Sequence, residues 1–484
     1  MPSRTLSLVS LMFLTLPAAY AADPAPVDCT HLVAWMAGGL SKSNLTRLVQ
    51  SRGVSFVVTP KMHKELLVAG ATPELVNTLS HSKPTSAATT DCYASLIEAA
   101  ELVGKKQFEP AADRISALLE NDSHNGALHF VLGYIEQQRG DWDRAFDEYT
   151  SSKESEPDFA PAHNRLALVF YQGDDGDSAI DEARTALSMD FHDPEAYRML
   201  GLGHYANQQY DAAMNAFEES LARDPRNADV YYEMALVARD QQFADKTIQF
   251  LRKSLELDPQ LWQAHSSLGA LLGQQKKFSE AIVELNVAKH LAPNQPSVRE
   301  ELANVYYAKG DFDVAIAEYH ELYRVNPDWH RGHDSLARAY LAKNEYSPAI
   351  AELKIAIEQN PTNAAQHRAL GQLLLLSDQR ADAVRELQVA VELDPDSAAS
   401  HYYLGTGLLE LQRLPAALQE FQEAVRLEPS AEHHYALAAC LMNLGRDGQA
   451  LEEMRIATRL DPQKTLYHAR EEELLRLMRS NGAR

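Results

Sequence analysis

The residues best suited to chemistry are seven histidines that share one repeated position along the chain. They are His129, His163, His265, His333, His367, His401 and His434, with Tyr197, Tyr231 and Arg299 filling the same place elsewhere. Imidazole nitrogens bind transition metals, so a ladder of metal sites is one interpretation. Neighbouring helices pack about 8–10 Å apart, however, whereas zinc needs several converging nitrogens at about 2 Å. We therefore expect these side chains to fill space between helices, without a metal or cofactor.

Other signs of catalysis are weak. The sequence contains no HExxH, GxSxG or CxxC motif and no glycine-rich nucleotide loop. Cys29 and Cys92 could pair in an oxidising compartment, or remain as two thiols, while we expect Cys440 to be packed and inert. Catalysis by the N-terminal segment would use His31, His63 and Cys29, but this segment is too short to enclose a site. We expect that the chain is not an enzyme.

Several columns of residues recur every 34 residues, which indicates a repeat protein. The proline column is Pro157, Pro225, Pro259, Pro293, Pro327, Pro361, Pro395 and Pro429. The alanine column is Ala145, Ala179, Ala213, Ala281, Ala315, Ala349, Ala383 and Ala417, with Thr247 as an exception. A column of small residues follows an apolar neighbour at Gly133, Ala167, Gly201, Ala235, Gly269, Ala303, Ala337, Gly371 and Gly405. Small residues allow close helix contact and proline ends a helix, so each unit is predicted to be a helical hairpin that stacks on its neighbours.

The order of these columns resembles the tetratricopeptide-repeat (TPR) pattern, as in Leu268-Gly269, Ala281, Leu285, Ala288 and Pro293. The resemblance implies an all-α fold, a right-handed superhelical solenoid of ten to eleven helical hairpins with about twenty-one helices from residue 92 onward. The array spans 92–464: a degenerate first repeat at 92–125, full repeats over 126–431 and a last repeat at 432–464. The histidine column corresponds to a bulky aromatic residue in this family, which favours the packing interpretation.

The segments that flank the array have other signals. Arg4, the apolar stretch Leu6–Leu16 and Ala19-Tyr20-Ala21 are typical of a signal peptide over 1–21. Residues 23–82 are predicted to form a small, mostly helical module, because Thr59-Pro60 and Thr72-Pro73 are helix-start signals. Residues 83–91 read as a linker, and 465–484 as a C-terminal capping helix.

The net charge of −23 limits the kinds of partner. An acidic chain is a poor candidate for nucleic acid or an anionic membrane surface, and it suits a basic partner. With the signal peptide removed, we expect no membrane span, and we expect the chain to be exported to the periplasm or outside the cell. The oligomeric state stays open.

The TPR resemblance implies that the first helix of each hairpin lines a concave groove that binds a protein or an extended peptide. The residues expected there are Tyr134, Tyr171, Tyr205, Tyr232, Tyr307, Tyr402, Arg198, Arg239, Arg331, Arg338, Arg368, Asn304 and Gln372. Tyrosine and arginine are frequent binding anchors. The alternative is a solvated face on which Asp334 pairs with Arg331 and Arg338. No Lys–Asn pair of the kind that holds a C-terminal carboxylate in some TPR proteins is present in the matching places.

Together these features favour a non-catalytic protein–protein or protein–peptide interaction scaffold that uses the groove of the array. The alternative function is a recognition or accessory subunit of a separate enzyme in envelope biogenesis or glycan transfer. The TPR fold does not identify the partner.

Overall fold

The computed structural model describes residues 25–82, 92–327, 329 and 331–482, and these residues form 27 helices and no strand. The all-α fold predicted from the sequence is therefore confirmed. The expected signal peptide (1–21) and linker (83–91) lie outside the described residues. Within the described part of the chain, none of the helices has the length and apolar character needed to cross a bilayer.

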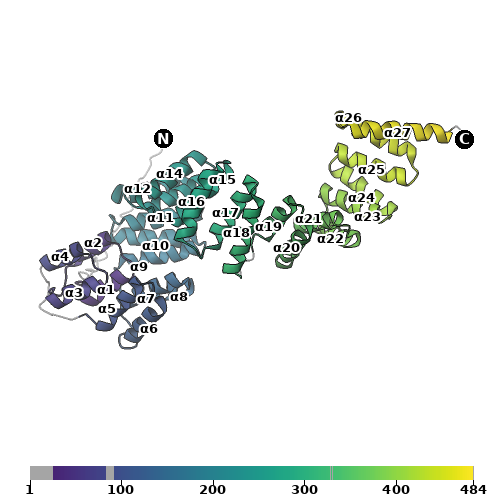
Figure 1. Ribbon diagram of the computed structural model, residues 1–484. Helices are drawn as coiled ribbons and strands as arrows, with labels where there is room; N and C mark the ends of the chain where they lie inside the picture. The colour runs from purple at the N-terminus through teal and green to yellow at the C-terminus, as the bar shows by residue number, and fades with distance from the viewer. Residues whose placement is uncertain (1–24, 83–91, 328, 330, 483–484) are drawn as a thin grey trace, which may run out of the picture. The chain divides into compact units, whose positions relative to one another are not determined.

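The helices follow one another along the chain as Figure 1 shows. The N-terminal module contains α1 (Cys29–Ala37), α2 (Lys42–Arg52), α3 (Pro60–Val68) and α4 (Pro73–His81). The first helices of the repeats are α5 (Ala94–Gly104), α7 (Gly126–Arg139), α9 (Ala160–Gln172), α11 (Pro194–Ala206), α13 (Ala228–Asp240), α15 (Trp262–Gln274), α17 (Pro296–Lys309), α19 (His333–Ala342), α21 (Ala364–Leu376), α23 (Ala398–Glu410) and α25 (Ala431–Asn443). The second helices are α6 (Phe108–Leu119), α8 (Trp142–Ser155), α10 (Gly176–Met189), α12 (Tyr210–Arg223), α14 (Ala244–Leu257), α16 (Phe278–Leu291), α18 (Phe312–Val325), α20 (Tyr346–Gln359), α22 (Arg380–Leu393), α24 (Leu414–Leu427) and α26 (Asp447–Leu460), and α27 (Thr465–Gly482) comes last.

The chain divides into two compact units, residues 1–250 (unit 1) and 251–484 (unit 2). Unit 1 contains the N-terminal module and the repeats through α13. Unit 2 contains the repeats from α15 onward and α27. From residue 92 onward the described residues form 23 helices, slightly more than the twenty-one predicted from the sequence. The difference arises because the degenerate first repeat still forms a complete pair, α5 and α6.

The column of small residues lies where the two helices of a hairpin meet. Every member from Gly133 to Gly405 is buried. A methyl group added at Gly269 would lie 2.6 Å from Cγ of Leu285 and 3.1 Å from the carbonyl oxygen of Ala281. The facing Ala281 has no exposed surface. Small side chains are thus required on both helices, because the backbones approach too closely for larger ones.

The turn inside each hairpin contains a residue with positive φ, and only some of these residues are glycines that indicate the turn in the sequence. Gly140, Gly310 and Gly445 have positive φ, as is expected for glycine in a turn. Non-glycine residues adopt the same conformation, with φ between 57° and 63°, at Lys106, Asp174, Gln208, Gln242, Lys276, Asn344, Asp378 and Gln412. The fold therefore imposes this turn geometry even where the residue disfavours it.

One predicted position is wrong. The sequence places Arg331 on a first helix, but α19 begins only at His333, and Arg331 lies in a bend before it. Gly332 has φ +91° and forms the N-cap, so the helix cannot extend back through it. The hydroxyl of Tyr323 donates a hydrogen bond to the Arg331 carbonyl oxygen at 3.0 Å, which holds the bend.

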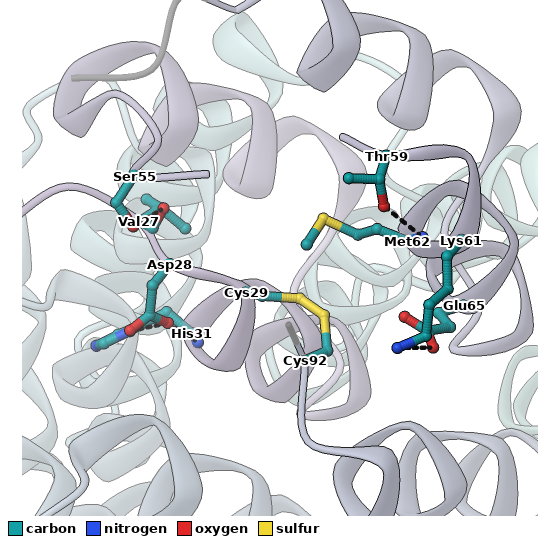
Figure 2. Close-up of a disulfide and its surroundings, with 10 residues drawn as sticks. All are labelled: Val27, Asp28, Cys29, His31, Ser55, Thr59, Lys61, Met62, Glu65 and Cys92. Atoms are coloured by element: carbon teal, nitrogen blue, oxygen red, sulfur yellow. Dashed lines mark hydrogen bonds and ion pairs between the residues drawn. A yellow bond between two sulfur atoms is a disulfide. The ribbon is translucent and has the colours of Figure 1, made fainter. Parts of the chain in front are cut away.

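The N-terminal module packs into unit 1 and shares its core. Figure 2 shows the disulfide that joins Cys29 on α1 to Cys92 just before α5, with Cα atoms 5.3 Å apart. Trp35 of α1 is fully buried and stacks on Phe159 at 4.7 Å between ring centres. A single apolar cluster runs from Val27 in the module to Val169 in α9. The module is thus part of the folded body of unit 1.

Candidate protein-binding face

An apolar cleft of about 430 Å³ lies on the first helices α19, α21 and α23 of unit 2. We call it the α21 cleft. It is lined by Ala337, Arg338, Leu341, Leu353, Ala369, Gln372, Leu373, Leu375, Leu376, Tyr402, Tyr403, Thr406 and Glu410. Three residues predicted from the sequence, Arg338, Gln372 and Tyr402, are brought together here. The leucines of this lining were not predicted from the sequence as binding residues.

The α21 cleft exposes apolar side chains that a folded chain normally buries. Leu376 is 60% exposed and Leu341 is 37% exposed. Tyr402 and Tyr403 meet edge to face at 5.1 Å, and the Tyr402 hydroxyl donates to Glu432 Oε1 at 3.2 Å. Burial and the neighbouring Glu432 carboxylate raise the pKa of Tyr402, so its hydroxyl stays protonated. The cleft therefore offers apolar surface with fixed hydrogen-bonding groups at its edge, as binding pockets for organic ligands do.

The lining of the α21 cleft includes one arginine, Arg338, and one glutamate, Glu410, and Arg368 lies on α21 outside that lining. Arg338 is 59% exposed, and its nearest carboxylate among the described residues is Asp334 at 3.9 Å. Arg368 on α21 donates to the Ser397 hydroxyl at 3.3 Å, and no carboxylate of a described residue lies within 4.0 Å of it. Glu410, the acidic residue of the lining, pairs with Arg380 at 3.1 Å, and Arg380 also pairs with Asp378.

The remaining predicted residues of unit 2 serve the array itself. Asn304 accepts a hydrogen bond of 2.6 Å from the hydroxyl of the buried Tyr319, so its amide oxygen is already used. Tyr307 lies below the Arg338 guanidinium at 5.8 Å from its ring centre. Arg331 lies over Trp329 outside any helix. Tyr307 thus supports Arg338 from the neighbouring first helix.

In unit 1 the module covers part of the predicted face. The Arg165 side chain lies over the Tyr134 ring at 5.4 Å and donates to the carbonyl oxygens of Gly38 (3.3 Å) and Gly39 (3.2 Å). The backbone of Gly39 comes so close that an added methyl would lie 2.7 Å from the Tyr134 ring. Tyr134 is therefore a contact of the module, which fills the place that we assigned to a partner.

A buried ion pair occupies the next predicted position. Arg198 on α11 binds Glu233 on α13 through Nη2 and Oε1 at 2.6 Å, and it also contacts Glu195 at 3.1 Å. Burial raises the pKa of Glu233 to about 7, and the Arg198 guanidinium opposes this rise. Because its charge is compensated inside the fold, Arg198 joins two first helices and is poorly placed to bind a partner.

The tyrosines farther along unit 1 form a shallow polar hollow of about 480 Å³. The Tyr205 hydroxyl donates to Asp240 at 2.5 Å, and Arg239 pairs with Asp240 at 2.9 Å. Tyr171 lines the same hollow, and burial raises its pKa to about 12. Tyr232 lies on α13 and is half-buried. This hollow brings together Tyr171 and Tyr205 as predicted, but its polar groups largely satisfy one another.

Each histidine of the repeated column binds a glutamate on the second helix of its own hairpin. The Nδ1-to-carboxylate distances are 2.5–2.8 Å in His129–Glu148, His163–Glu182, His265–Glu284, His333–Glu352, His367–Glu386, His401–Glu420 and His434–Glu453. Arg299 pairs with Glu318 in the same way. In the described part of the chain, no group of three His, Cys, Asp or Glu converges as metal ligands would. The histidines of this column therefore link the two helices of each hairpin. The glutamate 19 residues after each histidine is the signal in the sequence that could have predicted this pairing.

The three residues considered for catalysis in the module are either separated from one another or already bound to other groups. Cys29 is bonded to Cys92. His31 contacts Asp28 at 2.7 Å and Glu156 at 3.4 Å. Burial acts to lower the pKa of His31, but the two carboxylates outweigh it and raise the pKa to about 10. His63 is exposed on α3. This arrangement brings no nucleophile to a base.

The fold defines the class of protein, an all-helical array of stacked hairpins. Matches to two family models identify the kind of repeat. Residues 194–227 match the tetratricopeptide repeat, as do four overlapping segments at 300–364, 335–398, 368–432 and 402–465. The chain thus carries tetratricopeptide repeats in both units, and such repeats are in general protein–protein interaction modules. No match to a curated protein was found.

Several solved structures are similar over parts of the chain. YrrB, described as "a TPR protein with an unusual peptide-binding site", is 21% identical over 39% of this chain and 97% of its own, with a TM-score of 0.36. PilF of Pseudomonas aeruginosa is 23% identical over 46% of this chain and 96% of its own (TM-score 0.39). A tetratricopeptide repeat protein of Parabacteroides merdae is 14% identical over 51% of this chain and 99% of its own (TM-score 0.38).

Proposed function

We propose that this chain is a non-catalytic interaction scaffold and that unit 2 binds a partner polypeptide in the α21 cleft. The observation that carries the proposal is the exposed apolar lining, above all Leu376 at 60% exposure on a first helix. Covering such surface stabilises a complex by roughly 25 cal/mol for each Å² removed from water. A cleft of about 430 Å³ is at the small end of the range for organic ligands, which suits one or two side chains of a polypeptide.

The alternative function, a recognition subunit of a separate enzyme, would use the same face. The two functions differ in what binds: one enzyme with high affinity, or several client proteins. No feature of the described residues favours the enzyme partner, so the scaffold is the primary proposal.

We also propose that the chain is exported. The disulfide between Cys29 and Cys92 supports this, because such bonds persist mainly in oxidising compartments. The apolar start of the sequence supports it independently. Sequencing the N-terminus of the chain from its native cells should give Ala22 as the first residue. A chain that still begins at its initiator methionine would contradict export.

The interaction test compares two leucines that are similarly exposed. Leu376→Arg places a charge in the α21 cleft, whereas Leu460→Arg changes a leucine that is 52% exposed on α26 and does not line the cleft. The parent chain and both variants are used to capture proteins, and each captured protein is purified and titrated by calorimetry. We expect one or more partners whose affinity falls at least tenfold with Leu376→Arg and is retained with Leu460→Arg. Equal binding to all three chains would show that the α21 cleft is not the binding site.

A further inference from the structure

Arg338, which lines the α21 cleft, and Arg368 on α21 differ in their pairing from two arginines on second helices of the same unit. Arg324 and Arg426 bind their own helix neighbours Glu321 and Glu423 at 2.6 and 2.5 Å. Arg338 has only Asp334 at 3.9 Å, and Arg368 has the Ser397 hydroxyl. The chain carries 68 acidic and 45 basic residues, so carboxylates are abundant. Arg338 and Arg368 nevertheless have no carboxylate closer than 3.9 Å among the described residues.

The position of Arg338 is fixed by its neighbours. Its guanidinium lies over the Tyr307 ring at 5.8 Å and donates to the Ser335 hydroxyl at 2.9 Å. These contacts leave most of the side chain in water, since it is 59% exposed. Guanidinium groups bind carboxylates through paired hydrogen bonds, and a held, exposed guanidinium is well prepared to do so. Arg368 stands on the adjacent first helix α21.

From this arrangement we infer that the partner segment in the α21 cleft carries an apolar side chain with an aspartate or glutamate close by in sequence. The inference rests on the proposed function and adds the chemistry of the ligand. Adjacent helices lie about 8–10 Å apart and an extended chain advances about 3.3 Å per residue, so the acidic residue should lie within three residues of the apolar one.

An extended polypeptide fits better than a small amphiphile because the hollowed surface continues along the first helices beyond the α21 cleft. A second hollow of about 360 Å³ lies on α25, α26 and α27 of the same unit. Tyr435, Ala439 and Met442 of its lining belong to the first helix α25, and Tyr402 of the α21 cleft binds Glu432 at the start of that helix. A segment that crosses several first helices could fill both hollows in succession.

The test uses a random dodecapeptide library displayed on phage and four forms of the chain without its signal segment. These are the parent, Leu376→Arg, the double variant Arg338→Glu/Arg368→Glu, and the matched control Arg324→Glu/Arg426→Glu. The control makes the same change of net charge on exposed second-helix arginines (70% and 63% exposed) outside the α21 cleft. Far-UV circular dichroism confirms that each form is helical before selection.

We expect the parent and the control to enrich peptides with an apolar residue within three positions of Asp or Glu. The Arg338→Glu/Arg368→Glu variant should instead enrich Lys and Arg, and a synthetic peptide from the parent selection should bind this variant at least tenfold more weakly. Enriched peptides that are basic or uncharged, or that are the same for the parent and this variant, would overturn the inference and leave the scaffold function intact. If the parent enriches no peptide relative to Leu376→Arg, both the inference and peptide binding in the α21 cleft fail. Displacement of bound peptide by laurate alone, without an acidic peptide preference, would point to an amphiphile and also overturn it.

Discussion

At the scale of single residues, the histidine–glutamate pairs link the first and second helices of their hairpins. A neutral or charged imidazole can bind glutamate through Nδ1, and several rings also contact a carbonyl oxygen at the preceding turn, as His401 does with Pro395 at 3.0 Å. Each ring thus ties two helices together, and the rings of His129, His265, His367 and His401 also hold the preceding turn. This use of histidine accounts for the recurrence of the residue at one position of the repeat.

His129 offers a direct test of this role. Its hydrogen bond to Glu148 is the main cause that raises its pKa above the ordinary 6.5, while burial partly opposes the rise. The stabilisation from this pair is therefore full below pH 6.5 and is lost as the pH rises through the raised pKa. We expect an NMR titration of His129 to show a midpoint above 6.5, and Glu148→Gln to lower it. A midpoint that Glu148→Gln leaves unchanged would contradict the pairing.

The small residues at the helix contacts predict a steric cost. Ala281 is fully buried opposite Gly269, so Ala281→Leu should overpack the hairpin and lower the free energy of unfolding by about 1–3 kcal/mol. Val283 on the same helix is 62% exposed, so Val283→Leu is a matched control with little expected effect. Urea denaturation followed by circular dichroism measures both. Equal stability of the Ala281→Leu variant and the parent would exclude a close contact at this position.

At the scale of elements, the N-terminal module is docked on the repeats by a few buried groups. Arg47 of α2 binds Asp193 at 2.7 Å, and Asp193 also accepts a hydrogen bond of 2.7 Å from Asn164. Burial raises the pKa of Asp193, and Arg47 counteracts this rise. Arg47 therefore compensates a carboxylate that is almost inaccessible to water.

Removing this compensation should weaken the docking of the module. We expect Arg47→Ala to destabilise unit 1 by about 3 kcal/mol, because it leaves the Asp193 charge buried without its partner. Adding Asp193→Asn should recover part of that loss. Lys42→Ala, which breaks an exposed pair with Glu74, should cost much less, because water screens that pair. Hydrogen exchange of α2 measures the three effects. An Arg47→Ala variant no weaker than Lys42→Ala would argue against this docking contact.

The disulfide adds a covalent constraint to the same docking. Cys29 and Cys92 are separated by 63 residues, and a loop of this length corresponds to about 4 kcal/mol in the chain-entropy treatment. We expect the unfolded chain from an oxidising compartment to expose one reactive thiol, that of Cys440, and three after reduction. Thiol titration in urea measures this number. Three thiols without reductant would contradict the bond.

The helices could be predicted from the sequence where the residues that determine them lie close together in the chain. The hairpins follow from columns repeated every 34 residues, and Thr59 and Thr72 act as N-caps, accepting from the backbone N–H groups of Met62 and Leu75, as their Thr-Pro pairs indicate. The docking of the module was not predictable, because it depends on single contacts between distant residues such as Trp35 and Phe159. The α21 cleft was missed in part for a similar reason. Its leucines look like core residues in the sequence, and only the arrangement of three first helices leaves Leu376 exposed.

At the scale of the whole molecule, charge should affect the binding of a partner both at long range and at direct contact. The net charge of −23 should attract a partner that is basic overall, and added salt should slow that association. At contact range, Arg338 in the α21 cleft and Arg368 on α21 are instead available to a carboxylate. A partner that satisfies both would be a basic protein with a short acidic and apolar segment.

Site-specific photo-crosslinking tests the central claim most directly. A photoreactive benzoylphenylalanine is placed at position 376 in the α21 cleft, and separately at position 460 on α26 as the control with similar exposure. Each chain is irradiated with the purified partner, and the cross-linked peptides are identified by mass spectrometry. If the α21 cleft binds the partner, position 376 forms the cross-link to an extended segment with an apolar and an acidic residue, and position 460 forms none. Cross-links from position 460 with none from position 376 would contradict the claim.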